Sequence, residues 1–287
     1  MSLQSPGIVK AANSVITSLK PEINLIKQFQ FDLSKEVADY GKKVLVPVVD
    51  GGTAEQYNAD SSNYGKATGS LDAVYIELTS QPKATIPITS ADMLELGNAS
   101  IWEKAAEAGR NSVSKAISKT IGGLFTTDNC QAGKAVMATV TKANLAGLRA
   151  KCKGRIADTV LLLCPDYYAT MLSLFDSNVY GGTDPIQDGY VPRLYGFKAV
   201  VCAYDLPSGV KGAIVPGDGV ATAVRPVAIP LPEAYPECDV VYDEETGFAL
   251  TAMRHTDFNT AKTFVNITTL VGADLLRKAD TWYISAS

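Results

Sequence analysis

The side chains of this sequence that could do nucleophilic or acid–base chemistry are few and far apart. Its single histidine, His255, stands two residues before Asp257, and such a pair could activate a serine or cysteine brought in from a remote part of the chain. A histidine and an aspartate this close are commonplace, and a structural histidine explains the pair better. No GxSxG or HExxH motif accompanies them. We therefore expect no catalytic residue and keep an uncharacterised enzyme using His255 as an alternative.

Metal and cofactor sites are not indicated either. A zinc site needs clustered ligands, whereas the five cysteines are widely spaced and form no CxxC pair. The acidic run that begins at Asp239 could attract a cation, but a solvated turn before Gly247 explains it as well. The sequence contains no GxGxxG or GxxxxGK[ST] motif for phosphate binding. Gly217-Asp218-Gly219 is a lone GxG, which is too short to indicate such a site. We expect no metal, no cofactor and no disulfide among the cysteines at positions 130, 152, 164, 202 and 238.

The composition describes an ordinary globular protein with a modest charge. The 287 residues carry a net charge of -4, so the chain as a whole lacks the basic footprint of a nucleic-acid-binding protein. Charged residues make up 20%, somewhat below the usual quarter, which favours contacts buried between chains. The longest aliphatic run, 160–164, is far too short to span a membrane, and the first residues do not resemble a secretory signal.

The elements that position these side chains begin with an arm and a long hairpin. Residues 1–40 are weakly patterned and predict an arm with a short helix. Strands are predicted over 43–49 and 72–78, where Val74, Ile76 and Leu78 share one face, and Pro47 and Pro87 mark edge strands. Between the two strands, residues 50–70 contain no large aliphatic side chain, which predicts an extended polar tip.

Helices and further strands follow the hairpin. A capping box at Ser100 opens a predicted helix of about twenty residues, which ends at Gly122-Gly123. A second helix is predicted over 141–153. The remaining predictions are a mixed α/β unit over 156–225, with strands at 159–164, 196–202 and 212–215 and a helix opened by Pro165, and later strands at 248–253, 263–271 and 281–284.

This order of elements resembles the major capsid proteins of tailed phages, of the Hong Kong 97 type, over nearly the whole chain. Two stretches carry most of the resemblance. The first joins Thr159-Val160-Leu161-Leu162-Leu163-Cys164-Pro165-Asp166-Tyr167-Tyr168 to the segment 189–201, which ends Gly196-Phe197-Lys198-Ala199-Val200-Val201. The second joins 247–258 to 270–277. The family often has a proline after the arginine at this point, whereas this chain has Lys278.

The resemblance implies an α+β, Hong Kong 97-type capsid fold with an N-arm, an extended E-loop hairpin, a peripheral domain with a long spine helix, and an α/β axial domain. In this chain those parts would be the arm at 1–42, the E-loop at 43–90, the peripheral domain at 91–155, the axial domain at 156–240, the peripheral return strands at 241–265, and the C-terminal strands at 266–287, which rejoin the axial domain.

The resemblance also implies a function. The chain would be the major capsid protein of a tailed bacteriophage, forming hexamers and pentamers of an icosahedral shell around double-stranded DNA. Its partners would be further copies of itself, scaffolding and portal proteins, and packaged DNA by weak contact, with assembly in the host cytoplasm and no membrane. An encapsulin-type nanocompartment shell is the alternative with the same fold. The expected subunit-interface residues are Tyr57, Tyr64, Lys66, Trp102, Gly181, Gly182 and Asp184.

Overall fold

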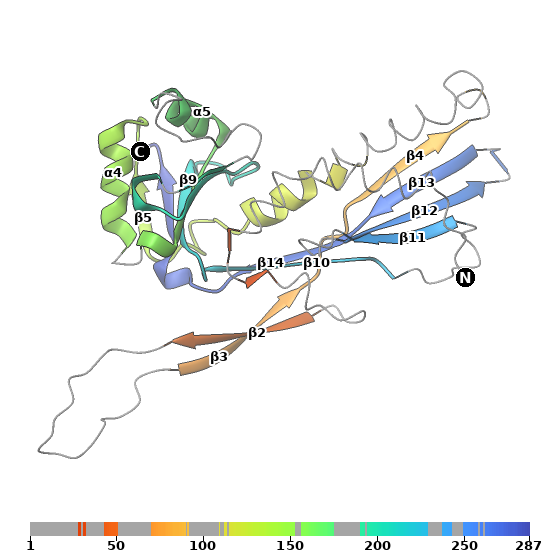
Figure 1. Ribbon diagram of the computed structural model, residues 1–287, viewed down its shortest axis with the longest axis horizontal. Helices are drawn as coiled ribbons and strands as arrows, with labels where there is room; N and C mark the ends of the chain where they lie inside the picture. The colour runs from red at the N-terminus through yellow and green to blue at the C-terminus, as the bar shows by residue number, and fades with distance from the viewer. Residues whose placement is uncertain are drawn as a thin grey trace, which may run out of the picture.

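The structure is a computed structural model in which helices and strands are mixed along an elongated molecule (Figure 1). No helix of its described part is long and apolar enough to cross a membrane. The residues that it describes are 28–29, 31–32, 43–50, 70–89, 91, 109, 112–113, 115–152, 156–174, 190–192, 194–228, 237–242, 249–257, 259–260 and 262–287.

A six-stranded sheet lies at one end of the molecule (Figure 1). Its order is β5, β15, β9, β6, β8 and β7. β5 runs parallel to β15 and β6 parallel to β8, and the other neighbours are antiparallel. The bounds are β5 (Gly133–Val136), β6 (Thr159–Leu163), β7 (Tyr190–Pro192), β8 (Ala199–Cys202), β9 (Gly212–Pro216) and β15 (Trp282–Ser285).

Two helices cover one face of this sheet. α4 (Lys142–Leu148) and α5 (Pro165–Ser173) contribute Leu145 and Met171, both fully buried, to an apolar cluster with β6, β8 and β9. α5 begins at Pro165 because a proline fits the first helical position, where no backbone donor is needed. Short 3-10 helices join the elements: η1 (Arg149–Cys152), η2 (Ile156–Asp158) and η4 (Leu194–Gly196).

Two further sheets follow the six-stranded sheet along the length of the molecule (Figure 1). A three-stranded sheet lies in the middle and consists of β1 (Phe31–Asp32), β10 (Val220–Arg225) and β14 (Leu270–Leu275). An antiparallel four-stranded sheet lies at the far end, with β11 (Glu237–Tyr242), β12 (Ala249–Asp257), β13 (Lys262–Thr268) and β4 (Lys83–Ile88). The strands β2 (Lys43–Asp50) and β3 (Ser70–Glu77) form a separate two-stranded sheet beside the three-stranded one (Figure 1). The short helix η6 (Lys278–Asp280) precedes β15.

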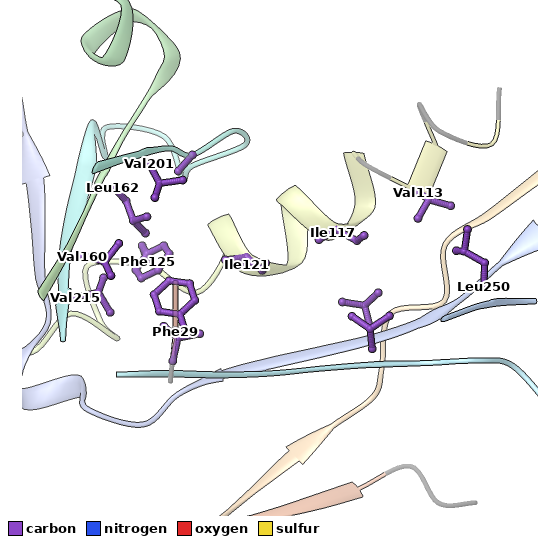
Figure 2. Packing of buried hydrophobic residues seen from close by; sticks show 14 of the residues in the cluster. Phe29, Val113, Ile117, Ile121, Phe125, Val160, Leu162, Val201, Val215 and Leu250 are labelled. Carbon is purple, nitrogen blue, oxygen red and sulfur yellow. The ribbon is translucent and has the colours of Figure 1, made fainter. Parts of the chain in front are cut away.

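One continuous core connects the two ends of the molecule. Residues 115–122 are helical, and Val113, Ile117 and Ile121 form the buried stripe that the sequence predicts. In Figure 2 these side chains line the helix from the neighbourhood of Leu250 in the four-stranded sheet to Phe125 beside the six-stranded sheet. The helix therefore packs both end sheets into a single apolar cluster.

Most strand predictions are confirmed, with small shifts at the ends. β2, β3, β6, β9 and β15 fall where the alternation places them, and β4, which contains Pro87, is an edge strand as expected. The capping box at Ser100 lies outside the described residues. The division into arm, E-loop, peripheral and axial domains stays a prediction.

Three predictions are corrected. The helix predicted over 141–153 ends at Leu148, where the chain tightens into η1. The strand predicted over 263–271 is two strands, because the chain passes from one sheet to the next at Thr269. The buried Thr269 hydroxyl lies 2.8 Å from the carbonyl oxygen of Ala249 and 3.1 Å from that of Arg225. Asp239 belongs to strand β11 rather than to a solvated turn.

Candidate intersubunit surface

The β2–β3 pair is the element through which the chain offers an exposed apolar surface. Eight residues of each strand pair antiparallel, from Lys43 opposite Glu77 to Asp50 opposite Ser70. Successive side chains of a strand point to opposite faces, so the pair has an inner and an outer face. An isolated two-stranded ribbon is marginally stable in water, and at least one face therefore needs a partner.

The inner face is anchored on the three-stranded sheet. Val46 and Ile76 are fully buried and pack with Leu78 against Ala221 and Ala223 of β10. The small alanine side chains allow the ribbon to approach the sheet closely. This packing fixes the base of the ribbon and determines which face remains open.

Gly272 of β14 makes this close approach possible. A Cβ atom added there would lie 2.8 Å from the carbonyl oxygen of Glu77 and 3.0 Å from Cδ2 of Leu78. Beside it, Ser80 and Val271 form an antiparallel bridge. The ribbon is thus held by backbone as well as by side-chain contacts at its base.

Within the part of the chain that the structure describes, the outer face remains uncovered. Leu45 and Tyr75 lie directly opposite each other across the two strands and are 52% and 59% exposed. Two of the four large apolar side chains that stand out as exposed in the described part of the chain therefore form one cross-strand pair. We call Leu45, Tyr75 and their exposed neighbours Pro47 and Ala73 the ribbon patch.

An ion pair borders the ribbon patch on one side. The Lys43 ammonium lies 2.6 Å from a carboxylate oxygen of Glu77. The hydrogen bond and the charge of each partner raise the pKa of Lys43 and lower the pKa of Glu77. Both groups are exposed, so the pair contributes more to the orientation of the two strands than to stability.

The predicted interface residues fall outside the part of the chain that the structure describes. This holds for Tyr57, Tyr64 and Lys66 of the ribbon tip, for Trp102, and for Gly181, Gly182 and Asp184. Their roles stay predictions. The ribbon patch itself was not among them, although the strict alternation of 73–78 already separates Tyr75 from the buried Ile76.

His255 has a structural environment in the four-stranded sheet. Its ring stacks on Phe264 of β13, with a centroid distance of 5.2 Å and an angle of 18°. Nδ1 lies 3.2 Å from Nδ2 of Asn266, whose Oδ1 accepts a 2.7 Å hydrogen bond from the Thr85 hydroxyl. The histidine is thus part of a polar network that links β12, β13 and β4.

Asp257 ends β12, and its carboxylate acts in the turn that follows. Its carboxylate accepts hydrogen bonds from the Thr260 hydroxyl at 2.8 Å and from the backbone of Asn259 at 2.9 Å. The hydrogen bond from Thr260, followed by that from Asn259, lowers the pKa of Asp257. This arrangement is typical of a turn-capping carboxylate.

The environments of Cys130, Cys152 and Cys202 do not resemble those of nucleophilic thiols. Burial raises the pKa of Cys130 and of Cys202 to about 11, and it also raises the pKa of Cys152. A thiol is nucleophilic as its thiolate, which these environments disfavour. Within the described ranges, no three His, Cys, Asp or Glu side chains gather as a metal site would require.

Comparisons with known proteins agree with the fold. Residues 43–283 match a family model described as phage capsid protein. A search of curated proteins finds no match. Among solved structures, a virus-like particle from Pyrococcus furiosus is similar with a TM-score of 0.57 and 11% identity, over 96% of this chain and 98% of that one.

Two further structures have the same fold at similarly low identity. The protein of Mycobacterium phage Che8 is 12% identical, with a TM-score of 0.52, over 89% of this chain and 88% of that one. The capsid of a native GTA particle is 13% identical, with a TM-score of 0.53, over 92% and 90% of the two chains.

Proposed function

This chain belongs to the phage capsid protein family, and on that premise we propose that it is the major capsid protein of a tailed bacteriophage. In this proposal it has the Hong Kong 97-type fold and assembles into hexamers and pentamers of an icosahedral shell that encloses double-stranded DNA. Its partners are further copies of itself, with scaffolding and portal proteins during assembly in the host cytoplasm. Membership of a capsid family suggests a structural rather than an enzymatic protein.

The observation that carries the proposal, beside the family match, is the two-sided ribbon. Its inner face is anchored on β10 and β14, while its outer face exposes Leu45 and Tyr75 in direct register. Tyrosine and leucine of this exposure gain from burial against a partner. In a closed shell every subunit makes the same contact, so that many weak contacts together stabilise the assembly.

The test is electron microscopy of the purified protein and of a ribbon-patch variant. We expect wild-type protein to form closed shells, and we expect the double variant Leu45→Ser, Tyr75→Ser to remain folded but to form few shells. Substitutions of exposed residues usually change stability by less than about 0.5 kcal/mol. Val136→Ser is the matched control, because Val136 is 62% exposed but lies on β5. Normal shells from the ribbon variant would contradict the role of the patch.

An encapsulin-type shell is a second candidate, because the resemblance to the Hong Kong 97 type implies the same fold for such a shell. The two candidates differ in what the shell contains. A phage capsid encloses double-stranded DNA, whereas a nanocompartment of this type encloses a cargo enzyme. The absorbance ratio of purified shells at 260 and 280 nm, together with a cargo gene beside the shell gene, distinguishes them.

A further inference from the structure

One stretch of the chain concentrates positive charge. Residues 129–157 contain six lysine or arginine side chains and no aspartate or glutamate. The other 20 of the 26 basic side chains share the rest of the chain with all 30 acidic ones. At the average frequency of acidic residues in this chain, a stretch of this length would hold about three. The stretch is therefore a local basic segment in an acidic protein.

The described part of this stretch folds into neighbouring elements at one end of the molecule. β5, α4 and η1 follow one another along the chain, and Ala135, Leu145 and Cys152 from the three elements belong to one apolar cluster. In Figure 1, α4 lies beside β5 at the edge of the molecule. We give the name basic patch to the described cations of these elements, which are Lys134, Lys142, Arg149 and Lys151.

Most side chains of the basic patch are accessible. Lys134, Lys142 and Arg149 are exposed, and Lys151 is partly exposed. In the part of the chain that the structure describes, neither Lys134 nor Arg149 forms an ion pair. A cation that no carboxylate of its own chain neutralises contributes its full charge to the attraction of an anion.

Lys151 is held beside the strand that carries Lys134. Its ammonium lies 4.5 Å from the centroid of the Trp282 ring, in a cation–π contact. The same ring lies against Gly133 of β5, where an added Cβ atom would be 3.2 Å from Cζ3 of Trp282. The contact positions the cation before any partner arrives, which reduces the side-chain entropy lost on binding.

The electrostatics of α4 explain only half of the basic patch. Cations near the C-terminal end of a helix interact favourably with its dipole, which accounts for Arg149 and Lys151 after the end of α4 at Leu148. Lys142 stands in the first turn of the helix, where the dipole disfavours a cation, and Lys134 lies on a strand. A structural role for the charges therefore leaves these two lysines unexplained.

The outward side of α4 offers charge without large apolar anchors. Its exposed residues between Lys142 and Leu148 are Ala143, Asn144, Ala146 and Gly147. An added Cβ atom at Gly147 would meet nothing within 4 Å. Interfaces between proteins depend on aromatic and other large side chains that fill pockets, and the exposed positions of α4 supply none. The surface therefore fits a partner that is recognised by its charge.

We propose that the basic patch binds the phosphate backbone of double-stranded DNA. A duplex carries one negative charge per about 1.7 Å of its length, so it presents several phosphates to one patch at the same time. Such contacts hold the duplex without reading its sequence. The identity of this DNA as the packaged genome rests on the proposed shell function, and the patch then faces the interior of the shell.

Fluorescence anisotropy of a labelled duplex of about 30 base pairs, titrated with the unassembled full-length chain, tests the binding. Between about 50 and 200 mM NaCl, we expect the association constant to fall steeply, with a log–log slope of at least about 3 in magnitude, because each neutralised phosphate contributes about 0.9. Binding that does not depend on salt, or no binding at about 50 mM NaCl, would overturn the proposal.

A double variant assigns this binding to the basic patch. Lys134→Gln with Arg149→Gln removes two exposed cations, and we expect the affinity at about 100 mM NaCl to fall at least about tenfold and the slope to lose about 2 in magnitude. The control, Lys115→Gln with Lys119→Gln, removes two exposed cations from the central helix and should change the affinity less than about twofold. Equal losses in the two double variants would overturn the proposal, because net charge alone would then explain the binding.

A second pair of variants keeps the test independent of the stability of the first. Ala146 is exposed on α4, and both Glu and Gln are good helix formers. Ala146→Glu and Ala146→Gln add side chains of nearly the same size that differ by one charge. We expect Ala146→Glu to bind the duplex at least about fivefold more weakly than Ala146→Gln. Equal affinities would contradict a phosphate contact at this surface.

Assembly without DNA distinguishes the duplex from another subunit as the partner. If the variant at Lys134 and Arg149 bound the duplex as the wild type does but formed no shells, the patch would be an intersubunit contact and the proposal would be wrong. Normal shells with weakened duplex binding would support it. A wild-type chain that binds the duplex as expected but forms no shells would support the basic patch while contradicting the proposed shell function.

Discussion

At the scale of single residues, the buried hydroxyl groups differ in whether they are paired. The Thr251 hydroxyl donates to the carbonyl of Val227 at 3.0 Å and accepts from its N–H at 2.9 Å. The Thr222 hydroxyl, equally buried, has no hydrogen-bond partner in the described part of the chain. Since side chains alternate along β10, Thr222 lies on the same apolar face as Val220 and Val224.

This difference predicts opposite effects of the same substitution. Thr222→Val should stabilise the subunit by about 1 kcal/mol, because it replaces an unpaired polar group with a methyl group of the same shape. Thr251→Val should destabilise it by about 1–3 kcal/mol, because it leaves the polar groups of Val227 unpaired. Urea denaturation of the unassembled subunit measures both. A loss of stability in Thr222→Val would contradict this account.

The buried thiols predict a dependence on pH. With a pKa of about 11, Cys130 and Cys202 should be alkylated slowly by iodoacetamide at pH 8, where about one thiol in a thousand is ionised. The unfolded thiol has a pKa near 8.5, so the folded state loses stability as the pH rises from about 8.5 towards 11. Mass spectrometry after labelling, with and without urea, measures how fast each thiol is alkylated in the unfolded and the folded chain. Rapid alkylation of Cys130 in the folded chain would contradict the prediction.

At the scale of elements, the ribbon depends on the shape of the strand beneath it. Gly272→Ala should destabilise the subunit by about 1–3 kcal/mol, because the new Cβ atom would meet the backbone oxygen of Glu77 at 2.8 Å. Gly147→Ala is the matched control on α4, where a Cβ atom meets nothing within 4 Å, and it should stabilise the helix by up to about 1 kcal/mol. Thermal unfolding measures both, and an unchanged Tm in Gly272→Ala would show that the ribbon tolerates displacement.

The ribbon tip predicts a separation of folding from assembly. Deletion of residues 52–69 with a short Gly-Ser closure should leave a soluble protein with near wild-type circular dichroism, because residues 50–70 contain no large aliphatic side chain with which to hold a core of their own. Closed shells should fail to form or become fragile, since the expected contacts of Tyr57 and Tyr64 are lost. Shells that form normally and resist heat as the wild type does would rule out an intersubunit role for the tip.

At the scale of the whole molecule, the arrangement of the layers is extended. The two end sheets lie at opposite ends of the central helix, and the ribbon lies outside both (Figure 1). A compact chain of 287 residues would have a radius of gyration of about 19 Å. Small-angle scattering of the dilute, unassembled subunit should give a clearly larger value. A value at or below 19 Å would be incompatible with a projecting ribbon.

The sequence by itself determined the elements whose patterns are local. Alternation placed β2 and β3, and a proline at the first helical position placed the start of α5. The apolar stripe through Ile117 and Ile121 identified the central helix. The order of these elements was enough to indicate the capsid family, because that order survives at identities where individual residues do not.

The tertiary structure alone decided which surfaces of these elements stay exposed and which remote segments come into contact. Strand β10 was not predicted, because Ala221 and Ala223 give no hydrophobic alternation, and their small size is explained only by the ribbon packed over them. The exposure of Leu45, the burial of Phe29 and the pairing of Asp218 with Arg277 depend on contacts between remote segments. Local periodicity indicates which side of an element is apolar, but what covers that side is determined by long-range packing.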